Sequence, residues 1–244
     1  MSGSKRQFLI YGHRGLPMRF TENTMESFRA SRNAGMDGIE LDVQTTKDGQ
    51  VIIYHDYEIE YNGKIVHPWD LTLEEARSIR LKNGEGIPTL KEVLVEFRDF
   101  NLIIELKTID ERMQRVNPGL EELVVKDLAG YDPSGFLFVS FDPRTMMELK
   151  NQNGKFVCGW NIARETIRAL GEIKPADIKE LGLDYIQPSS DAFTDDELLE
   201  FMRNGIPVIV WTVNTHDDAK HFMNLGINGI ISDRGDSITQ LFLE

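Results

Sequence analysis

Cysteine is almost absent from this 244-residue chain, and the single one, Cys158, cannot form a disulfide within the molecule. A lack of disulfides is typical of a reducing compartment, most simply the cytoplasm, which is the location we expect. The composition is otherwise that of a soluble globular protein, with 41% hydrophobic and 27% charged residues. We interpret Cys158 as a small buried hydrophobic residue on a strand.

Long apolar runs are also missing. No run approaches the ~18 residues that a membrane-spanning helix requires. The apolar run Phe8–Tyr11, near the N-terminus, is too short for the hydrophobic region of a secretory signal. No low-complexity or linker-like stretch divides the sequence, so we expect one domain over residues 1–244 and no stable membrane association.

Positive charge is scarce as well. The formal net charge is −13 and the pI is near 4.9, which argues against a nucleic-acid backbone or an anionic membrane as a partner. An anionic ligand would therefore have to be bound by local positive charge, from a metal ion and a few Arg and Lys side chains. The composition leaves the oligomeric state open.

What recurs along the chain is a helical segment that ends in glycine, followed by a short β-branched run, as after Gly182, Gly205 and Gly226. Glycine is the expected residue just past a helix C-terminus, and the apolar run behind it is typical of a buried strand. Strands that alternate with helices predict parallel βα units. We expect eight strands, at Phe8–Gly12, Gly38–Gln44, Leu102–Leu106, Phe136–Ser140, Phe156–Trp160, Tyr185–Gln187, Pro207–Thr212 and Gly229–Ser232.

Eight strands with eight intervening helices fit an α/β protein of the (β/α)8 TIM-barrel type, near its compact size of ~250 residues. The competing architecture, an open doubly wound sheet, lacks its Gly-rich phosphate-binding motif after the first strand. The expected helices are Thr24–Asn33, Leu90–Arg98, Leu120–Leu128, Pro143–Gln152, Pro175–Leu181, Asp195–Arg203, His216–Leu225 and Ser237–Phe242.

Residues 47–89 depart from this repeat and predict a small excursion between the second strand and the second barrel helix. Asp48-Gly49 lies between two apolar runs and is typical of a hairpin turn. A short helix capped by Thr72 is expected at Leu73–Ile79. Loops on this side of a TIM barrel form its catalytic face.

Charged residues interrupt the predicted strands where a stable core would contain Val, Ile or Leu. Glu40 and Asp42 are two residues apart and share one face of their strand, toward the barrel interior, and Glu105 and Lys107 repeat this arrangement on the third strand. Three carboxylates on adjacent strands repel one another unless a cation lies among them. All-oxygen ligation favours Mg²⁺ or Ca²⁺ over Zn²⁺.

Two histidines, His13 and His55, end separate apolar runs that should be close in space. Histidine titrates near neutral pH, so such a pair can serve as base and acid around a reacting centre. Arg14 and Lys107 offer cationic donors suited to phosphate oxygens. With a divalent ion, these groups predict a phosphoryl-transfer site. The alternative is a set of structural ion pairs in which Lys107 binds Glu105 and Arg14 binds Glu40.

Over nearly its whole length the chain resembles the glycerophosphodiester phosphodiesterase family, a group of TIM-barrel enzymes. Several of the shared motifs are individually common, but their conjunction in this order is specific. The matching residues are His13-Arg14-Gly15, Glu22-Asn23-Thr24 with Phe28, Gly38-Ile39-Glu40-Leu41-Asp42-Val43, His55-Asp56, Leu71-Thr72-Leu73-Glu74-Glu75, Ile87-Pro88-Thr89-Leu90, Glu105-Leu106-Lys107, Ser140-Phe141, Trp211-Thr212-Val213-Asn214 and Ser232-Asp233.

The resemblance implies metal-dependent hydrolysis of a small-molecule glycerophosphodiester to glycerol 3-phosphate and an alcohol such as choline or ethanolamine. It implies that His13 and His55 are the general acid and base. It also implies that Glu40, Asp42 and Glu105 bind one divalent cation, Mg²⁺ or Ca²⁺.

Five further residues receive roles from the same resemblance. Arg14 and Lys107 would hold the phosphate, and Trp211 would pack against the bound alcohol, unless it is simply a core aromatic residue. Glu22 and Asn23 would support the site, and Asn23 also suits the N-cap of the first helix.

The chain departs from the family at Thr21, where Pro is usual, and at Tyr57–Asn62, which lacks the family's Arg-Thr-Thr run and leaves the preferred alcohol open. One alternative activity is phospholipase D-type cleavage of lysophospholipids, which needs an apolar groove. Another is non-catalytic binding of a phosphate ligand, which has no need of paired histidines. The only hint of such a groove in the sequence is the apolar set Leu16, Met18 and Phe20. The remaining histidines are expected at the surface; they are His67, His216 and His221.

Overall fold

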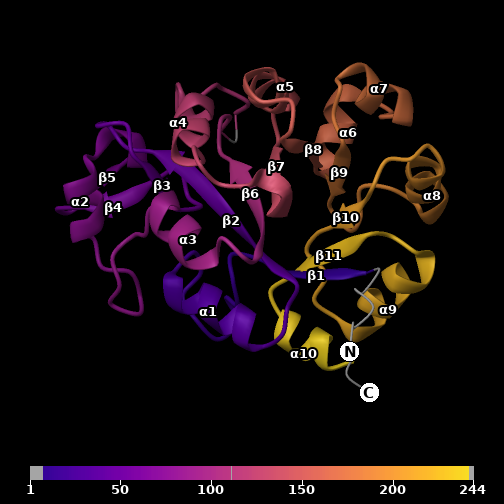
Figure 1. The fold of residues 1–244 in the computed structure, drawn as a ribbon, viewed down its shortest axis with the longest axis horizontal. Helices are drawn as coiled ribbons and strands as arrows, with labels where there is room; N and C mark the ends of the chain where they lie inside the picture. Colours follow the sequence, from indigo (N-terminus) through magenta and orange to yellow (C-terminus); the bar gives the residue numbers. More distant parts are fainter. Residues whose placement is uncertain (1–7, 111, 242–244) are drawn as a thin grey trace.

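The computed structural model describes residues 8–110 and 112–241. The described chain forms one large sheet in which the parallel strands follow the order β10-β11-β1-β2-β6-β7-β8-β9 (Figure 1). Isolated parallel bridges between Ile186 and Val208 and between Ser189 and Trp211 place β9 beside the β10 segment. The sheet is therefore a nearly closed barrel, and the expected TIM-barrel fold is confirmed.

The barrel strands coincide with the expected ones to within a few residues, except that the seventh is shorter. They are β1 (Leu9–Gly12), β2 (Gly38–Thr45), β6 (Asn101–Leu106), β7 (Phe136–Ser140), β8 (Val157–Ile162), β9 (Tyr185–Pro188), β10 (Ile209–Val210) and β11 (Gly229–Ser232).

Helices alternate with these strands, and no helix of the described residues is long and apolar enough to cross a membrane. Among them α6 was not expected, and the expected end of the last helix, Phe242, lies outside the described residues. The helices are α1 (Met25–Asn33), α3 (Leu90–Phe97), α4 (Leu120–Asp127), α5 (Pro143–Gln152), α6 (Arg164–Leu170), α7 (Pro175–Glu180), α8 (Asp195–Arg203), α9 (His216–Leu225) and α10 (Gly235–Gln240).

Threonine side chains begin several of these helices. Thr89 accepts a hydrogen bond from the backbone N–H of Glu92, whose side chain reaches back to the N–H of Thr89. The first helix is capped in the same position by Thr24, which accepts from the N–H of Ser27. The expectation that Asn23 caps this helix is therefore wrong, because its amide is engaged elsewhere.

Side chains alternate across β2 as predicted. Ile39, Leu41 and Val43 are fully buried in the layer between the strands and the outer helices, where each contributes ~1.5–3 kcal/mol relative to exposure. The barrel interior has its own apolar layer, which includes Tyr11, Ile103, Val139, Tyr185 and Ile231.

The excursion after β2 stands at one edge of the molecule (Figure 1). The predicted turn at Asp48-Gly49 is confirmed, because β3 (Val51–Ile53) pairs antiparallel with β2. A second hairpin, which was not expected, follows, and then the predicted helix ends at Ser78 rather than Ile79. The additional elements are β4 (Ile59–Tyr61), β5 (Lys64–Val66), η1 (Pro68–Asp70) and α2 (Leu73–Ser78), packed over a small core of Ile52, Ile59, Leu71, Ala76 and Ile87.

Candidate active site

Three carboxylates converge inside the mouth of the barrel. Glu40 and Asp42 come from β2 and Glu105 from the neighbouring β6, where Asp42 and Glu105 are directly paired in register. One oxygen of each lies within 4.8 Å of the others, and the three residues are only 2%, 2% and 7% exposed. This is the arrangement of oxygen ligands around a hard divalent cation.

The surroundings of the three carboxylates shift their pKa values in different directions. Burial raises the pKa of Glu40 well above its usual range, and the charges of Asp42 and Glu105 raise it further. Burial also raises the pKa of Glu105. Burial acts in the same direction on Asp42, but Lys107, His55 and Arg14 outweigh it and lower its pKa. A divalent ion fits here, because it would stabilise all three carboxylates in their ionised form.

Each carboxylate is oriented by a neighbouring donor. The Asn23 side-chain amide donates to Oδ2 of Asp42 over 2.9 Å. The backbone N–H of Arg14 donates to Oε2 of Glu40 over 3.1 Å. Oε2 of Glu105 accepts from the side-chain amide of Asn161, on β8, over 2.9 Å; the sequence analysis did not single out this residue.

A tight turn after β1 presents Arg14 to the same site. Arg14 has a left-handed backbone (φ 51°), and the next residue, Gly15, has φ 92°. A Cβ atom on Gly15 would lie 2.3 Å from Oγ of Ser27, so only glycine fits. The Arg14 guanidinium donates to Glu22 over 3.0 Å and lies 3.4 Å from Asp42.

His13 is held by a partly buried network at the end of β11. Its Nδ1 lies 2.7 Å from Oδ1 of Asp233, whose Oδ2 accepts from the side-chain amide of Asn214 over 2.7 Å. Burial would raise the pKa of Asp233, but the hydrogen bond and charge of His13 and the bond from Asn214 lower it. Asp233 therefore presents an ionised carboxylate to His13. Only the Ser232-Asp233 motif indicated it in the sequence.

His55 has a similar but more exposed partner. Its Nδ1 lies 2.8 Å from Oδ1 of Asp56, and the two side chains are 32% and 67% exposed. In the described part of the chain, no hydrogen bond involves Nε2 of either His13 or His55. Each imidazole is thus held through Nδ1.

Lys107 and Trp211 lie at the mouth of the barrel in different surroundings. The Lys107 ammonium is 3.7 Å from Glu105 and 4.0 Å from Asp42. Burial alone would lower its pKa, but these two carboxylates raise it, so Lys107 is charged.

Trp211 is partly buried, donates from Nε1 to the carbonyl of Gln187 over 2.8 Å, and meets Phe141 edge-on.

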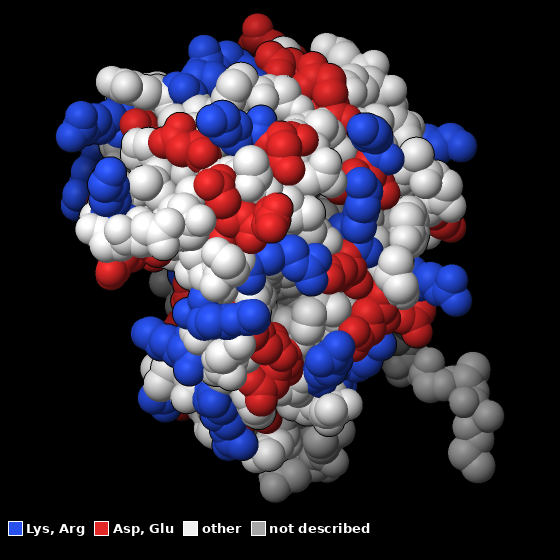
Figure 2. Space-filling view, turned by 90° about the vertical axis from the view of Figure 1, so that its left-hand side faces the viewer, with Lys and Arg blue, Asp and Glu red and all other residues white. Residues whose placement is uncertain are grey.

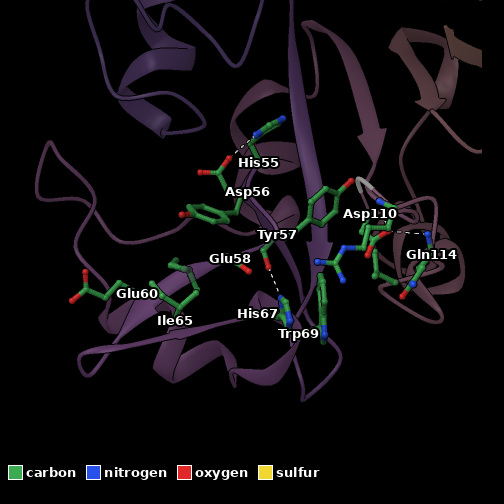
Figure 3. Close-up of a pocket in the computed structure, with 14 residues that line it drawn as sticks. His55, Asp56, Tyr57, Glu58, Glu60, Ile65, His67, Trp69, Asp110 and Gln114 are labelled. Atoms are coloured by element: carbon green, nitrogen blue, oxygen red, sulfur yellow. Dashed lines mark hydrogen bonds and ion pairs between the residues drawn. The ribbon is translucent and has the colours of Figure 1, made fainter. Parts of the chain in front are cut away.

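Two cavities include His55 in their lining. One, of about 910 Å³, lies over the β4–β5 hairpin and includes Tyr57, His67 and Trp69 (Figure 3). The other, of about 460 Å³, includes Met18 and residues of the β1–α1 loop. His67, expected at the surface, is half-buried in the first of these cavities.

Acidic and basic side chains are mixed across the face that carries the excursion (Figure 2). Many charged side chains of the described residues are paired, as in the bidentate contact of Arg29 with Glu96 at 2.6 and 2.7 Å. This face therefore offers no broad basic surface, in agreement with the net charge of −13.

The profile of the glycerophosphoryl diester phosphodiesterase family matches residues 13–237. The chain belongs to this family. It is 29% identical to the glycerophosphodiester phosphodiesterase of Caldanaerobacter subterraneus, across 96% of this chain and 97% of that relative. The chain is therefore a phosphoric diester hydrolase of glycerophosphodiester type, which sets aside a purely ligand-binding role.

Solved structures show the same fold. A glycerophosphodiester phosphodiesterase from Thermotoga maritima is 27% identical and superposes with a TM-score of 0.77, covering 98% of this chain and 100% of that one. A phosphodiesterase from Oleispira antarctica, solved in complex with the product sn-glycerol-3-phosphate, is 22% identical with a TM-score of 0.81 and 97% coverage of both chains.

Proposed function

We propose that this enzyme cleaves glycerophosphodiesters to glycerol 3-phosphate and a free alcohol in a metal-dependent reaction. The observation that carries the proposal is the buried triad of Glu40, Asp42 and Glu105 beside two histidines whose Nε2 atoms have no described partner. The product named for the Oleispira antarctica structure supports glycerol phosphate as one half of the substrate.

The three carboxylates would hold one Mg²⁺ or Ca²⁺, both of which prefer oxygen ligands. When bound, this ion supplies Lewis-acid stabilisation of charge on the phosphate. The Lys107 ammonium and the Arg14 guanidinium, held by Glu22, add cationic donors toward the phosphate oxygens. Trp211 forms an apolar wall for the bound organic group.

His13 and His55 move the protons. One accepts a proton from the attacking hydroxyl as its oxygen bonds to phosphorus and the P–O bond to the departing alcohol breaks. Attack by water gives glycerol 3-phosphate directly, whereas attack by a hydroxyl of the glycerol gives a cyclic phosphate that water then opens. The other histidine donates a proton from Nε2 to the oxygen of the departing alcohol. Asp233 and Asp56, bonded to the Nδ1 atoms, hold each ring in the tautomer that this exchange requires.

Replacing either histidine tests the proposal. His55→Ala should retain binding of glycerol 3-phosphate in a calorimetric titration and lose roughly 100-fold or more in turnover of glycerophosphocholine. Near-native turnover by His55→Ala and by His13→Ala would contradict the two-histidine mechanism.

The turnover assay also distinguishes cleavage of lysophospholipids from cleavage of soluble glycerophosphodiesters. The apolar groove that lysophospholipid cleavage needs is only partly present. Leu16 is 3% exposed, and Met18 and Phe20 line the smaller cavity beside His55 together with the polar side chains of Arg19, Glu22 and Lys82. We therefore expect soluble glycerophosphodiesters to be cleaved faster than detergent-dispersed lysophosphatidylcholine. The opposite order would favour the lipid activity.

A further inference from the structure

Tyr57 covers one side of the buried Lys107. It lies two residues past His55, in the stretch Tyr57–Asn62 where this chain departs from the family pattern. The Lys107 ammonium lies 4.6 Å from the centre of the Tyr57 ring. Lys107 itself is only 5% exposed, so the Tyr57 ring is among the groups that limit where the ammonium can move.

The Tyr57 hydroxyl fixes the ring in this position. It donates to the carbonyl of Ile109, two residues past Lys107 on the same chain segment. Burial raises the pKa of Tyr57 to about 12, so the hydroxyl keeps its proton at neutral pH. Tyr57 therefore joins the segment that carries His55 to the end of β6.

The excursion holds the other side of Tyr57 (Figure 3). The imidazole of His67 donates from Nδ1 to the carbonyl of Tyr57 over 2.7 Å. His67 also stacks on Trp69, with ring centres 4.5 Å apart. The Trp69 ring is in turn tilted relative to the Tyr57 ring, with ring centres 6.4 Å apart. The carbonyl, ring and hydroxyl of Tyr57 are thus each fixed by a different contact.

An aromatic ring suits this position better than another carboxylate would. Its face attracts an ammonium, and a hydrogen bond to the Tyr57 side chain takes up only part of the donor capacity of Lys107, so the charge and the remaining N–H donors stay available. A carboxylate would neutralise Lys107 and compete with phosphate. We propose that Tyr57 is a positioning residue that aims the Lys107 ammonium at the substrate phosphate, an inference that rests on the proposed function.

A double-mutant cycle tests this coupling. Tyr57→Leu should lower kcat/KM for glycerophosphocholine, and the affinity for glycerol 3-phosphate measured by calorimetry with Ca²⁺ present, roughly 10-fold. In a Lys107→Met background the same substitution should change both by less than about twofold, because Tyr57 acts through Lys107. Equal losses in both backgrounds would overturn the proposal.

Tyr57→Phe and Tyr61→Leu complete the test. Tyr57→Phe keeps the ring and loses the hydroxyl with its contacts to the Ile109 carbonyl and to Lys107, so it should lose less affinity than Tyr57→Leu; an equal loss would overturn the role of the ring. Tyr61, on β4 of the same excursion, is the matched control, and Tyr61→Leu should leave both readouts unchanged. If the native enzyme cleaves no glycerophosphodiester, the proposed function fails, whereas inorganic phosphate in the calorimeter still tests the coupling of Tyr57 to Lys107.

Discussion

The imidazole of His13 and the carboxylate of Asp233 are 220 residues apart in sequence, and their Nδ1 and Oδ1 atoms are 2.7 Å apart in space. The neighbouring backbone is joined too, because the N–H of His13 donates to the carbonyl of Ser232 over 3.0 Å. The first and last strands of the barrel therefore meet at the site, and closure of the barrel positions a proposed proton carrier.

Asp233→Asn should lower kcat. A neutral amide cannot stabilise the imidazolium form of His13, so we expect a loss of about 100-fold, within the contribution typical of general acid–base catalysis. KM and the midpoint of urea unfolding should change little. Asp56→Asn serves as the comparison. The Asp56 side chain is 67% exposed, against 24% for Asp233, so kcat should fall less in Asp56→Asn than in Asp233→Asn. Native kcat in Asp233→Asn would show that His13 needs no charged partner.

Asn161→Ala should weaken metal binding. Its amide orients Oε2 of Glu105, and loss of such an outer contact typically costs 10- to 100-fold in metal affinity. Calorimetric titration with Ca²⁺ measures the change directly. Asn151→Ala, at an exposed position of α5, is the matched control and should bind as the native enzyme does. Equal affinities for the two variants would rule out this role.

The metal-free protein should become less stable as pH rises above about 4.5, the ordinary pKa of a glutamate. Glu40 and Glu105 have raised pKa values, so the folded state binds more protons than the unfolded state in this window. Stability then falls with increasing pH until both groups are ionised. The lowered pKa of Asp42 acts with the opposite sign, and its contribution is lost only as pH falls below its ordinary value of 3.8.

Urea unfolding in EDTA at several pH values, repeated with Ca²⁺, measures this dependence. Added Ca²⁺ should stabilise the protein most at high pH, because the ligands must lose their protons to bind it. Glu40→Gln should remove much of the slope in EDTA. An unchanged slope in that variant would mean that Glu40 is not the group that titrates.

Gly159→Ala should destabilise the barrel. A Cβ atom at this position of β8 would lie 2.4 Å from the ring of Tyr185, which is 2% exposed and bonded to the carbonyl of Phe138. Overpacking of this kind typically costs 1–3 kcal/mol in the free energy of unfolding. Gly154→Ala, with nothing within 4 Å of the added atom, should cost far less. Similar stabilities for the two variants would contradict the packing described here.

Much of the barrel is predictable because its strands are short apolar runs bounded by glycine and polar residues. Phe136–Ser140 and Gly229–Ser232 are found with the expected bounds. The helix α6 has no buried residue, so it lacks the apolar periodicity that marks a helix in sequence. The β4–β5 hairpin did have a local signal, since Asn62-Gly63 adopts the positive φ angles typical of a tight turn.

The site was partly predictable for a different reason. Glu40, Asp42, Glu105 and Lys107 stand out because charged residues interrupt buried strands. Asn161 carries no such signal, since its contact with Glu105 joins β8 to β6, which are separated by β7 in the barrel. The contact of Tyr57 with Lys107 is hidden in the same way, because it depends on how the excursion folds back over β6.

The most direct test of the metal-dependent two-histidine mechanism is the release of glycerol 3-phosphate from glycerophosphocholine in EDTA, Mg²⁺ or Ca²⁺, by the native enzyme, Glu40→Gln and His13→Ala. We predict release by the native enzyme only when a divalent cation is present, and a loss of roughly 100-fold or more in both variants. Equal release in EDTA, or near-native release by either variant, would contradict the account.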